Sequence, residues 1–199
     1  MPETIMDINQ VGLDQLKEYS EIPISFCVRS FLEVSTVAAG LGGLRLDERS
    51  LAQPYLKDYD TIEDDASPLF WPEQFNLSNW AFFLAREAGR SLGGAAVAWN
   101  TNGVHMLEGR ADLAVLWDLR VRPDARGQGI GRRLFAQAES WARQKGCRQI
   151  KVETQNINVP ACRFYVRMGC QLGQMHRYAY AGVPGCESEV MLCWYKDLQ

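Results

Sequence analysis

The feature that most constrains the fold is the run 112–121, which is apolar on both of its faces. Alternate positions form two apolar sets, namely Leu113, Val115, Trp117 and Leu119 against Ala114 and Leu116. A strand with one face in water alternates apolar and polar residues, so this run predicts a central strand covered on both sides. Such a strand requires further layers on both faces of its sheet.

Other patterns predict strands and helices around this central strand. Strands are expected at 24–37, 80–86, 92–99, 149–154, 172–180 and 188–195, and helices at 130–145 and 158–168. The stretches 40–43 and 47–78 hold glycines or prolines and are expected to be irregular or shortly helical. The order β-β-β-β-α-β-α-β-β predicts an α/β (α+β) fold with a mixed central β-sheet and helices on both faces.

Length and composition favour one folded domain over residues 1–199. Of the 199 residues 47% are hydrophobic, which is enough for one sizeable core. The start lacks a secretion signal and no run of eighteen apolar residues occurs, so we expect a cytoplasmic protein with no membrane partner. Six scattered cysteines without CxxC spacing, and only two histidines, predict reduced thiols and no metal site.

Charge is distributed unevenly along the chain. Residues 1–118 carry 8 basic and 18 acidic side chains, whereas residues 119–199 carry 13 basic and 6 acidic ones. Solvated helix faces and a solvated acidic loop at 58–65 would account for part of this asymmetry. The alternative is a basic region for a polyanionic ligand and an acidic region for a cationic one. A net charge of −3 and the lack of alternating basic and aromatic residues argue against nucleic acid as the partner.

A glycine-rich turn joins the central strand to the helix expected at 130–145. It reads Arg126-Gly127-Gln128-Gly129-Ile130-Gly131. Glycines let a backbone approach a ligand closely, and a helix N-terminus offers unpaired N–H groups to a phosphate. Arg132 and Arg133 follow and add positive charge. The turn therefore predicts a pyrophosphate cradle, with a plain strand–helix connection as the alternative.

Two other glycine-rich fingerprints do not fit this turn. A nucleotide P-loop continues with Gly-Lys-Ser/Thr, but Gly131 is followed by Arg132 and Arg133. A dinucleotide fingerprint has a further glycine three residues after Gly129, where Arg132 stands.

Two linked motifs resemble those of the GNAT superfamily of acetyltransferases. The first is Leu119-Arg120-Val121, then Pro123, then Arg126-x-x-Gly129-x-Gly131. The second is Asn158-x-x-Ala161-x-x-Phe164-Tyr165-x-x-x-Gly169. The resemblance implies a splayed pair of central strands and an acetyl-CoA core at about 112–170, with 1–111 supplying N-terminal strands and the acceptor side. The implied acetyl-CoA contacts are Leu119, Arg120, Val121, Arg126, Gly127, Gln128, Gly129, Ile130, Gly131, Arg132, Asn158, Ala161, Phe164 and Tyr165, with backbone contacts from Leu119 and Val121.

A narrower resemblance points to the streptothricin acetyltransferases. It rests on 153–165, on Tyr180 and on Glu189-Val190 with Trp194-Tyr195, and more weakly on the acidic segment 53–60. It implies a small, cationic primary amine as the partner and an antibiotic-resistance role. A monomer or a homodimer is expected. Two positions differ from the usual pattern: Cys170 replaces a phenylalanine, and His176 stands where an acid is common.

Three residues are candidates for the chemistry. Tyr165 matches the family tyrosine that protonates the coenzyme A sulfur, and a phenol, with an ordinary pKa near 10, is protonated at neutral pH. A core aromatic residue beside Phe164 is the alternative interpretation. The general base is left open between Asp118, the only charged residue between Leu113 and Leu119, and Glu153, at the end of the next strand. Either carboxylate could instead satisfy backbone groups or hold the substrate while water removes the proton.

Two other functions remain possible on the sequence alone. A protein or peptide amine acetyltransferase would need an open groove, whereas the long acidic segment 47–78 is more typical of a pocket wall. A non-catalytic acetyl-CoA sensor would bind the same ligand, but the presence of Tyr165 argues against it.

Overall fold

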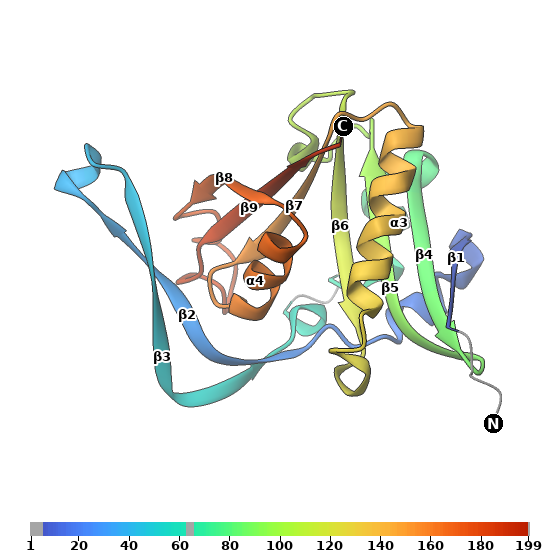
Figure 1. Ribbon diagram of the computed structural model, residues 1–199, viewed down its shortest axis with the longest axis horizontal. Coiled ribbons are helices and arrows are strands. Elements are labelled where there is room, and N and C mark those ends of the chain that lie inside the picture. Colours follow the sequence, from blue (N-terminus) through green and yellow to red (C-terminus); the bar gives the residue numbers. More distant parts are fainter. Residues whose placement is uncertain (1–5, 63–65, 199) are drawn as a thin grey trace. The chain divides into compact units, whose positions relative to one another are not determined.

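The computed structural model describes residues 6–62 and 66–198 (Figure 1). Within this part the chain divides into two compact units. The first consists of 6–24, 59–62, 66–152 and 196–198, and the second of 25–58 and 153–195. Glu63, Asp64 and Asp65 of the predicted acidic loop lie outside the described residues.

Five strands build the sheet of the first unit. Their order is β1 (Asp7–Val11), β4 (Trp80–Glu87), β5 (Arg90–Trp99), β6 (Leu113–Val121) and the first part of β7 (Gln149–Gln155). Neighbours from β1 to β6 are antiparallel, whereas β6 and β7 are parallel. The hairpin expected at 80–99 and the central strand expected at 112–121 are confirmed.

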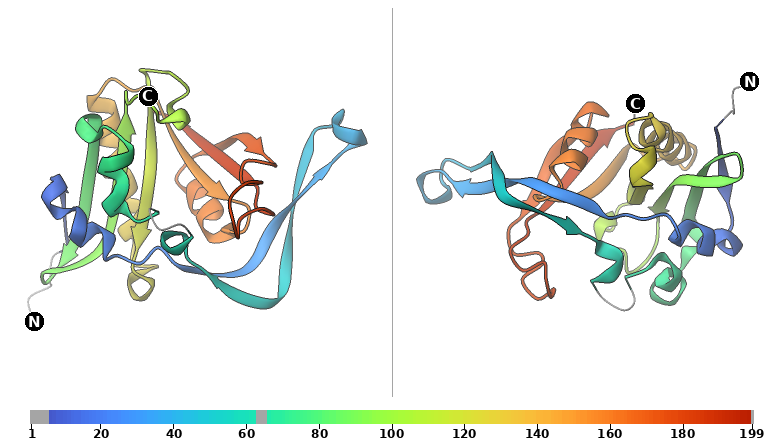
Figure 2. Two further views of the ribbon diagram at one scale, coloured as in Figure 1. Left: turned by 180° about the vertical axis from the view of Figure 1, so that it is seen from behind. Right: turned by 90° about the horizontal axis from the view of Figure 1, so that it is seen from below.

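Helix α3 (Ile130–Gln144) covers one face of this sheet and packs on β4, β5 and β6. Its predicted apolar stripe is buried: Ile130, Leu134, Phe135, Ala138, Trp141 and Ala142. The short helices α1 (Leu16–Ser20) and α2 (Trp71–Gln74) contribute Leu16, Tyr19 and Trp71 to a core on the opposite face. The left view of Figure 2 shows α2 in front of the strands and α3 behind them.

A glycine on β5 allows α1 to approach this core closely. A Cβ atom at Gly94 would lie 2.5 Å from the ring of Tyr19, so a larger residue would push the tyrosine away. The tyrosine ring also contacts Trp71 and Phe82 edge-on, with centroids 5.8 and 6.1 Å apart. Tyr19 is therefore fixed in position above the central strands.

A long two-stranded ribbon, β2 (Phe26–Thr36) with β3 (Leu44–Lys57), forms part of the second unit. The prediction of an irregular 47–57 is therefore wrong. The prediction relied on Pro54, because a proline cannot donate a hydrogen bond to a neighbouring strand. The register shifts between Val28, paired with Tyr55, and Ser30, paired with Ser50, so Pro54 lies in an interruption of the ladder.

The remainder of the second unit contains the end of β7, α4 (Val159–Arg167), β8 (Gln171–His176) and most of β9 (Met191–Asp197). The strand expected at 172–180 ends earlier, at His176, and residues 177–187 form turns. The last strand begins at Met191 rather than at residue 188. With β7-β9-β8 added, the seven strands form one mixed sheet, which confirms the predicted fold class.

Short 3-10 turns connect these elements, at Leu13–Gln15, Ala38–Gly40, Tyr59–Thr61, Pro68–Phe70, Leu77–Asn79, His105–Leu107 and Pro123–Ala125. The six cysteines, all within the described residues, form no disulfide, and five of them are buried, as expected for core residues. Among the helices that the structure describes, none combines the length and the apolar character needed to cross a bilayer.

Candidate active site

The glycine-rich turn has the backbone geometry that a phosphate cradle requires. Gly127 and Gly129 have φ angles of +83° and +81°, a region in which residues with a Cβ atom are strained. Gly129 is the N-cap of α3. Because glycine has no side chain to cap the helix, the first N–H groups of α3 face the turn. The turn can therefore hold an anionic group by its backbone.

The arginines of this turn are accessible to a ligand. Arg126 and Arg132 are exposed, and the Arg126 Nε donates to the Val121 carbonyl at 2.9 Å, at the end of β6. Gly127, Gln128 and Gly129 are exposed as well, whereas the Ile130 side chain is buried. A ligand can therefore reach the backbone of the turn, and Ile130 could contribute only through its backbone.

The central strand β6 continues beyond its pairing with β7. That pairing joins Leu113–Leu116 to Gln149–Val152, and β6 runs on to Val121. Leu119 and Val121, the residues expected to give backbone contacts, lie in this continuation, and β5 pairs with them at Ala95 and Gly93. The pattern agrees with the splayed strands that the resemblance implied.

A β-bulge at Trp117 changes which side chains of β6 share a face. Asp118 pairs with Ala96 but Leu116 pairs with Val97, so Trp117 is the extra residue. Trp117 packs against Trp80 on the face of α1 and α2, and Asp118 contacts Tyr19 on the same face. Leu119 is consequently on the opposite face from Trp117, contrary to the simple alternation read from the sequence.

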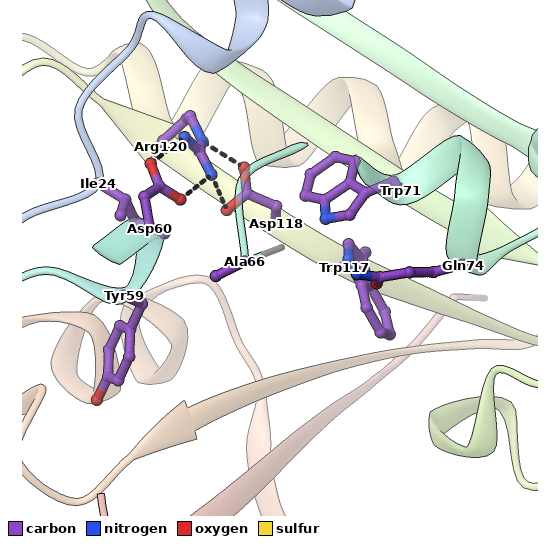
Figure 3. Close-up of a pocket in the computed structure, with 9 residues that line it drawn as sticks. All are labelled: Ile24, Tyr59, Asp60, Ala66, Trp71, Gln74, Trp117, Asp118 and Arg120. Atoms are coloured by element: carbon purple, nitrogen blue, oxygen red, sulfur yellow. Dashed lines mark hydrogen bonds and ion pairs between the residues drawn. The ribbon is translucent and has the colours of Figure 1, made fainter. Parts of the chain in front are cut away.

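This face holds a pocket of about 490 Å³ within the first unit (Figure 3). Figure 3 shows Arg120 between two carboxylates, with Trp71, Trp117 and Gln74 across from them. The lining residues are Ile24, Tyr59, Asp60, Ala66, Trp71, Gln74, Trp117, Asp118 and Arg120. We call this the aromatic–acidic pocket. Sequence reasoning had singled out only Asp118 and Arg120 as functional residues among them.

Arg120 forms a buried charge network in this pocket. Its Nε donates to Asp118 Oδ2 at 2.7 Å, its Nη1 and Nη2 donate to Asp60 at 2.8 and 3.1 Å, and Nη1 also donates to the Ile22 carbonyl. Burial alone would lower the pKa of Arg120, but the negative charge of Asp118 and the hydrogen bonds to Asp118 and Asp60 together outweigh burial, so the pKa is raised. Arg120 therefore remains charged and bridges the two carboxylates.

Asp118 is held from a second side by Tyr19. The Tyr19 hydroxyl donates to Asp118 Oδ2 at 2.5 Å. Burial, and then the charge of Asp118, raise the pKa of Tyr19 well above 10, so it stays a neutral donor. With Tyr19 and Arg120 both bound to it, Asp118 has the surroundings of an anchored structural carboxylate.

Glu153, the other candidate base, has different surroundings in the second unit. The Tyr180 hydroxyl donates to Glu153 Oε1, and the Gln155 amide donates to the Tyr180 hydroxyl at 3.0 Å. Burial, and then the charge of Glu153, raise the pKa of Tyr180, which therefore stays protonated as a donor. Sequence analysis names Tyr180 only as part of the family resemblance. Because Tyr180 lies 27 positions after Glu153, no local pattern indicates that the two side chains meet.

Helix α4 carries the second predicted motif. The Asn158 side chain accepts from the Ala161 N–H at 3.2 Å, which confirms the predicted N-cap. Tyr165 is buried at 5% exposure, and its ring lies 5.1 Å from that of Phe164. Gly169 and Cys170 follow the helix, and Cys170 is buried in place of the phenylalanine usual in the family.

The predicted site residues thus fall in both units. Asp118, Leu119, Arg120, Val121 and the turn 126–132 belong to the first, and Glu153, Asn158, Ala161, Phe164 and Tyr165 belong to the second. Within the first unit, β6 leads directly into the glycine-rich turn. That the two groups form one acetyl-transfer site remains a prediction.

The fold and the glycine-rich turn define an acetyltransferase. Residues 47–170 match the Acetyltransferase (GNAT) family, and the chain belongs to this family. It is an acetyl-CoA-dependent N-acetyltransferase. A streptothricin acetyltransferase of Escherichia coli is 30% identical over 182 residues, which are 92% of this chain and 91% of that relative.

Solved structures give a consistent result. A protein from Bacillus anthracis that is assigned as a streptothricin acetyltransferase, in complex with acetyl coenzyme A, has a TM-score of 0.74 at 26% identity, over 97% of this chain and 99% of that one. A nourseothricin acetyltransferase has a TM-score of 0.77 at 22% identity, over 98% and 100%. The latter identity is low enough that this likeness concerns the fold alone.

Proposed function

We propose that this enzyme acetylates a primary amine of a small cationic molecule, and that streptothricin-like antibiotics are the leading class of acceptor. The observation that carries the proposal is the aromatic–acidic pocket, which combines Asp60 and Asp118 with the indoles of Trp71 and Trp117. Carboxylates and aromatic faces are the groups that bind ammonium ions. The similarity to streptothricin acetyltransferases supports the same class of acceptor. Acetylation would remove a positive charge from such an antibiotic, the chemical basis for a resistance role.

The donor side of the proposal rests on the glycine-rich turn. We assign the pyrophosphate of acetyl-CoA to the backbone of Gly127–Gly131 and the first turn of α3, with Arg126 and Arg132 supplying charge. The continuation of β6 would supply backbone contacts at Leu119 and Val121. Asn158, Ala161 and Phe164 of α4 would complete the contacts, and Asn158 would also keep its role as the cap.

The chemistry requires one proton acceptor and one proton donor. The amine nitrogen forms a bond to the acetyl carbon as the carbon–sulfur bond breaks, and the nitrogen loses a proton while the leaving thiolate gains one. We assign the donor role to Tyr165 and the acceptor role to Glu153. The choice of Glu153 over Asp118 follows from their partners, because Asp118 is fixed in a charge network with Arg120 and Tyr19.

Steady-state release of free thiol from acetyl-CoA tests the function directly. The amines to compare are streptothricin, an aminoglycoside, a polyamine and lysine-containing peptides. We expect turnover with the small cationic amines and little with the peptides. Efficient use of the peptides would instead indicate a protein acetyltransferase. Tight binding of acetyl-CoA without thiol release from any amine would indicate a sensor.

A further inference from the structure

We propose that the aromatic–acidic pocket binds a second cationic group of the acceptor, one that does not react, so that the preferred acceptor carries at least two basic groups. This inference rests on the proposed function and deepens it. It concerns an ammonium or a guanidinium group held by Asp60 and the indoles of Trp71 and Trp117. The acetylated amine would be another group of the same molecule.

The charges of the pocket favour one bound cation. Asp60 and Asp118 supply two negative charges and Arg120 one positive charge, which leaves the lining with a net charge of −1. Tyr19, which contacts Asp118, stays neutral because its pKa is raised. A cationic group entering the pocket would therefore offset the net negative charge of this lining.

Of the two carboxylates, Asp60 is the one that a ligand can reach. The Asp118 side chain is 7% exposed and the Asp60 side chain is 22% exposed. Asp60 comes from the short turn Tyr59–Thr61, whereas Asp118 is part of β6 beneath Tyr19. Arg120 holds both Asp60 oxygens by parallel hydrogen bonds, so the carboxylate is already oriented before a ligand arrives.

The aromatic wall of the pocket is rigid. The Trp117 ring packs edge-on against Phe75 and Trp80, with centroids 5.1 and 5.3 Å apart. Trp71 is 6% exposed and packs against Trp80 at 6.0 Å. Indole faces attract cations most strongly among the aromatic side chains. The pocket therefore offers a preformed surface for a positive group and its attached methylene carbons.

The charge of the pocket also explains why the bound group would not be the one that reacts. An amine attacks the acetyl carbon only in its neutral form. A negatively charged, aromatic-lined pocket favours the protonated form of any amine inside it. An amine held there is thus kept in its unreactive state, and the pocket acts as an anchor for a remote charge.

The test compares a diamine with a monoamine of equal length, 1,4-diaminobutane with 1-aminobutane. We expect wild-type kcat/KM to be at least about tenfold higher for the diamine, because a hydrogen-bonded charge pair gives a factor of this size. Asp60→Asn should raise KM for the diamine about tenfold while kcat changes less than about twofold. Asp47→Asn removes one negative charge from an exposed ion pair in the ribbon and should leave both amines unaffected.

Calorimetric binding of 1,4-diaminobutane, without acetyl-CoA, separates this inference from the proposed function. We expect wild type and Asp47→Asn to bind alike and Asp60→Asn to bind at least about tenfold more weakly. If none of the amines compared above is acetylated but diamine binding follows this pattern, the proposed function is overturned and the anchor still stands. No binding by the wild type, or equal kcat/KM for the two amines, would overturn the anchor.

A second variant covers the case in which Asp60→Asn does not fold. Trp117→Leu removes an indole face and keeps both carboxylates of the pocket. It should weaken diamine binding severalfold in calorimetry, with the folded state checked by near-UV circular dichroism. Unchanged diamine affinity in a folded Trp117→Leu protein would contradict the role of the aromatic wall.

Discussion

Tyr180 links a turn of the second unit to the carboxylate that we assign as the base. Its hydroxyl donates to Glu153 and accepts from Gln155, so the two side chains on β7 and the tyrosine form one hydrogen-bonded group. The turn itself is held in place, because Lys57 forms a buried ion pair with Glu189 and also donates to the Gly185 carbonyl. Tyr180 is therefore a positioning residue for Glu153.

Tyr180→Phe removes a hydrogen-bond donor from a carboxylate and should make that carboxylate easier to protonate. If Glu153 is the base, the acidic limb of the kcat/KM profile should move to higher pH, by roughly one unit. Tyr178→Phe is the matched control, since Tyr178 lies on the same turn with 71% exposure. An acidic limb that moves equally in both variants would argue against a specific role for Tyr180.

We proposed Tyr165 as the general acid, and Tyr165→Phe tests this assignment. The change keeps the ring, which is buried beside Phe164, and removes only the hydroxyl. We expect kcat to fall by about 10²–10⁴, the usual contribution of a general acid, with little change in acetyl-CoA affinity. Single-turnover rates and calorimetric acetyl-CoA binding measure the two effects. Wild-type turnover would instead make Tyr165 a core aromatic residue.

At the scale of elements, the glycine-rich turn needs Gly129 for its backbone conformation and not because a side chain would lack room. A Cβ atom at Gly129 would meet no heavy atom within 4 Å, but its φ angle of +81° disfavours any other residue. Gly129→Ala should therefore destabilise the fold by about 1–2 kcal/mol and weaken acetyl-CoA binding. Urea unfolding and calorimetry measure these changes.

Gly182→Ala is the control for this prediction. Its Cβ atom would also meet nothing within 4 Å, but Gly182 lacks a positive φ angle. We expect its stability to stay the same or rise slightly, since alanine restricts the unfolded chain. Equal losses of stability in Gly129→Ala and Gly182→Ala would show that the special conformation of Gly129 is not what the turn requires.

The elements that the sequence predicted well are those with a local signal. The hairpin 80–99, the central strand and α3 each show their own periodicity, and the glycine-rich turn and the Asn158 cap are short motifs. Helices α1 and α2 have five and four residues, too few to show a helical repeat. Strand β3 mixes charged residues with scattered leucines, contains Pro54 and depends on its partner β2, so its own residues did not indicate a strand.

The aromatic–acidic pocket could not be predicted from the sequence, because its residues are brought together by features without a local pattern. A bulge at Trp117 shifts the alternation of β6 by one residue, and this shift brings Trp117, Asp118 and Arg120 onto one face. Period-two reasoning cannot locate such a bulge. The partners Asp60 and Trp71 come from segments about 50 residues earlier, so the aromatic–acidic pocket could be recognised only from the folded chain.

At the scale of the whole molecule, one ion pair makes stability depend on pH. Arg86 on β4 donates from Nε and Nη2 to the two oxygens of Glu18 on α1, at 2.7 and 2.5 Å. These bonds, and then a hydrogen bond from Ser91, lower the pKa of Glu18 from 4.5 to about 2. Between these pH values the unfolded chain takes up a proton that the folded chain does not, so acid favours unfolding.

The stability due to Glu18 is therefore fully present above about pH 4.5 and is lost as the pH falls towards 2. Glu18→Gln should lower the free energy of unfolding at pH 6 and make its decline between pH 4.5 and 2.5 shallower, as measured by urea unfolding. The effect should be smaller than the full pKa change implies, because the Glu18 side chain is 36% exposed and solvent screens the pair. Glu21→Gln, at an exposed glutamate beside α1, should keep the wild-type pH dependence. If Glu18→Gln also kept it, the acid sensitivity of the fold would have to come from other carboxylates, and α1 would not need this ion pair to stay on the sheet.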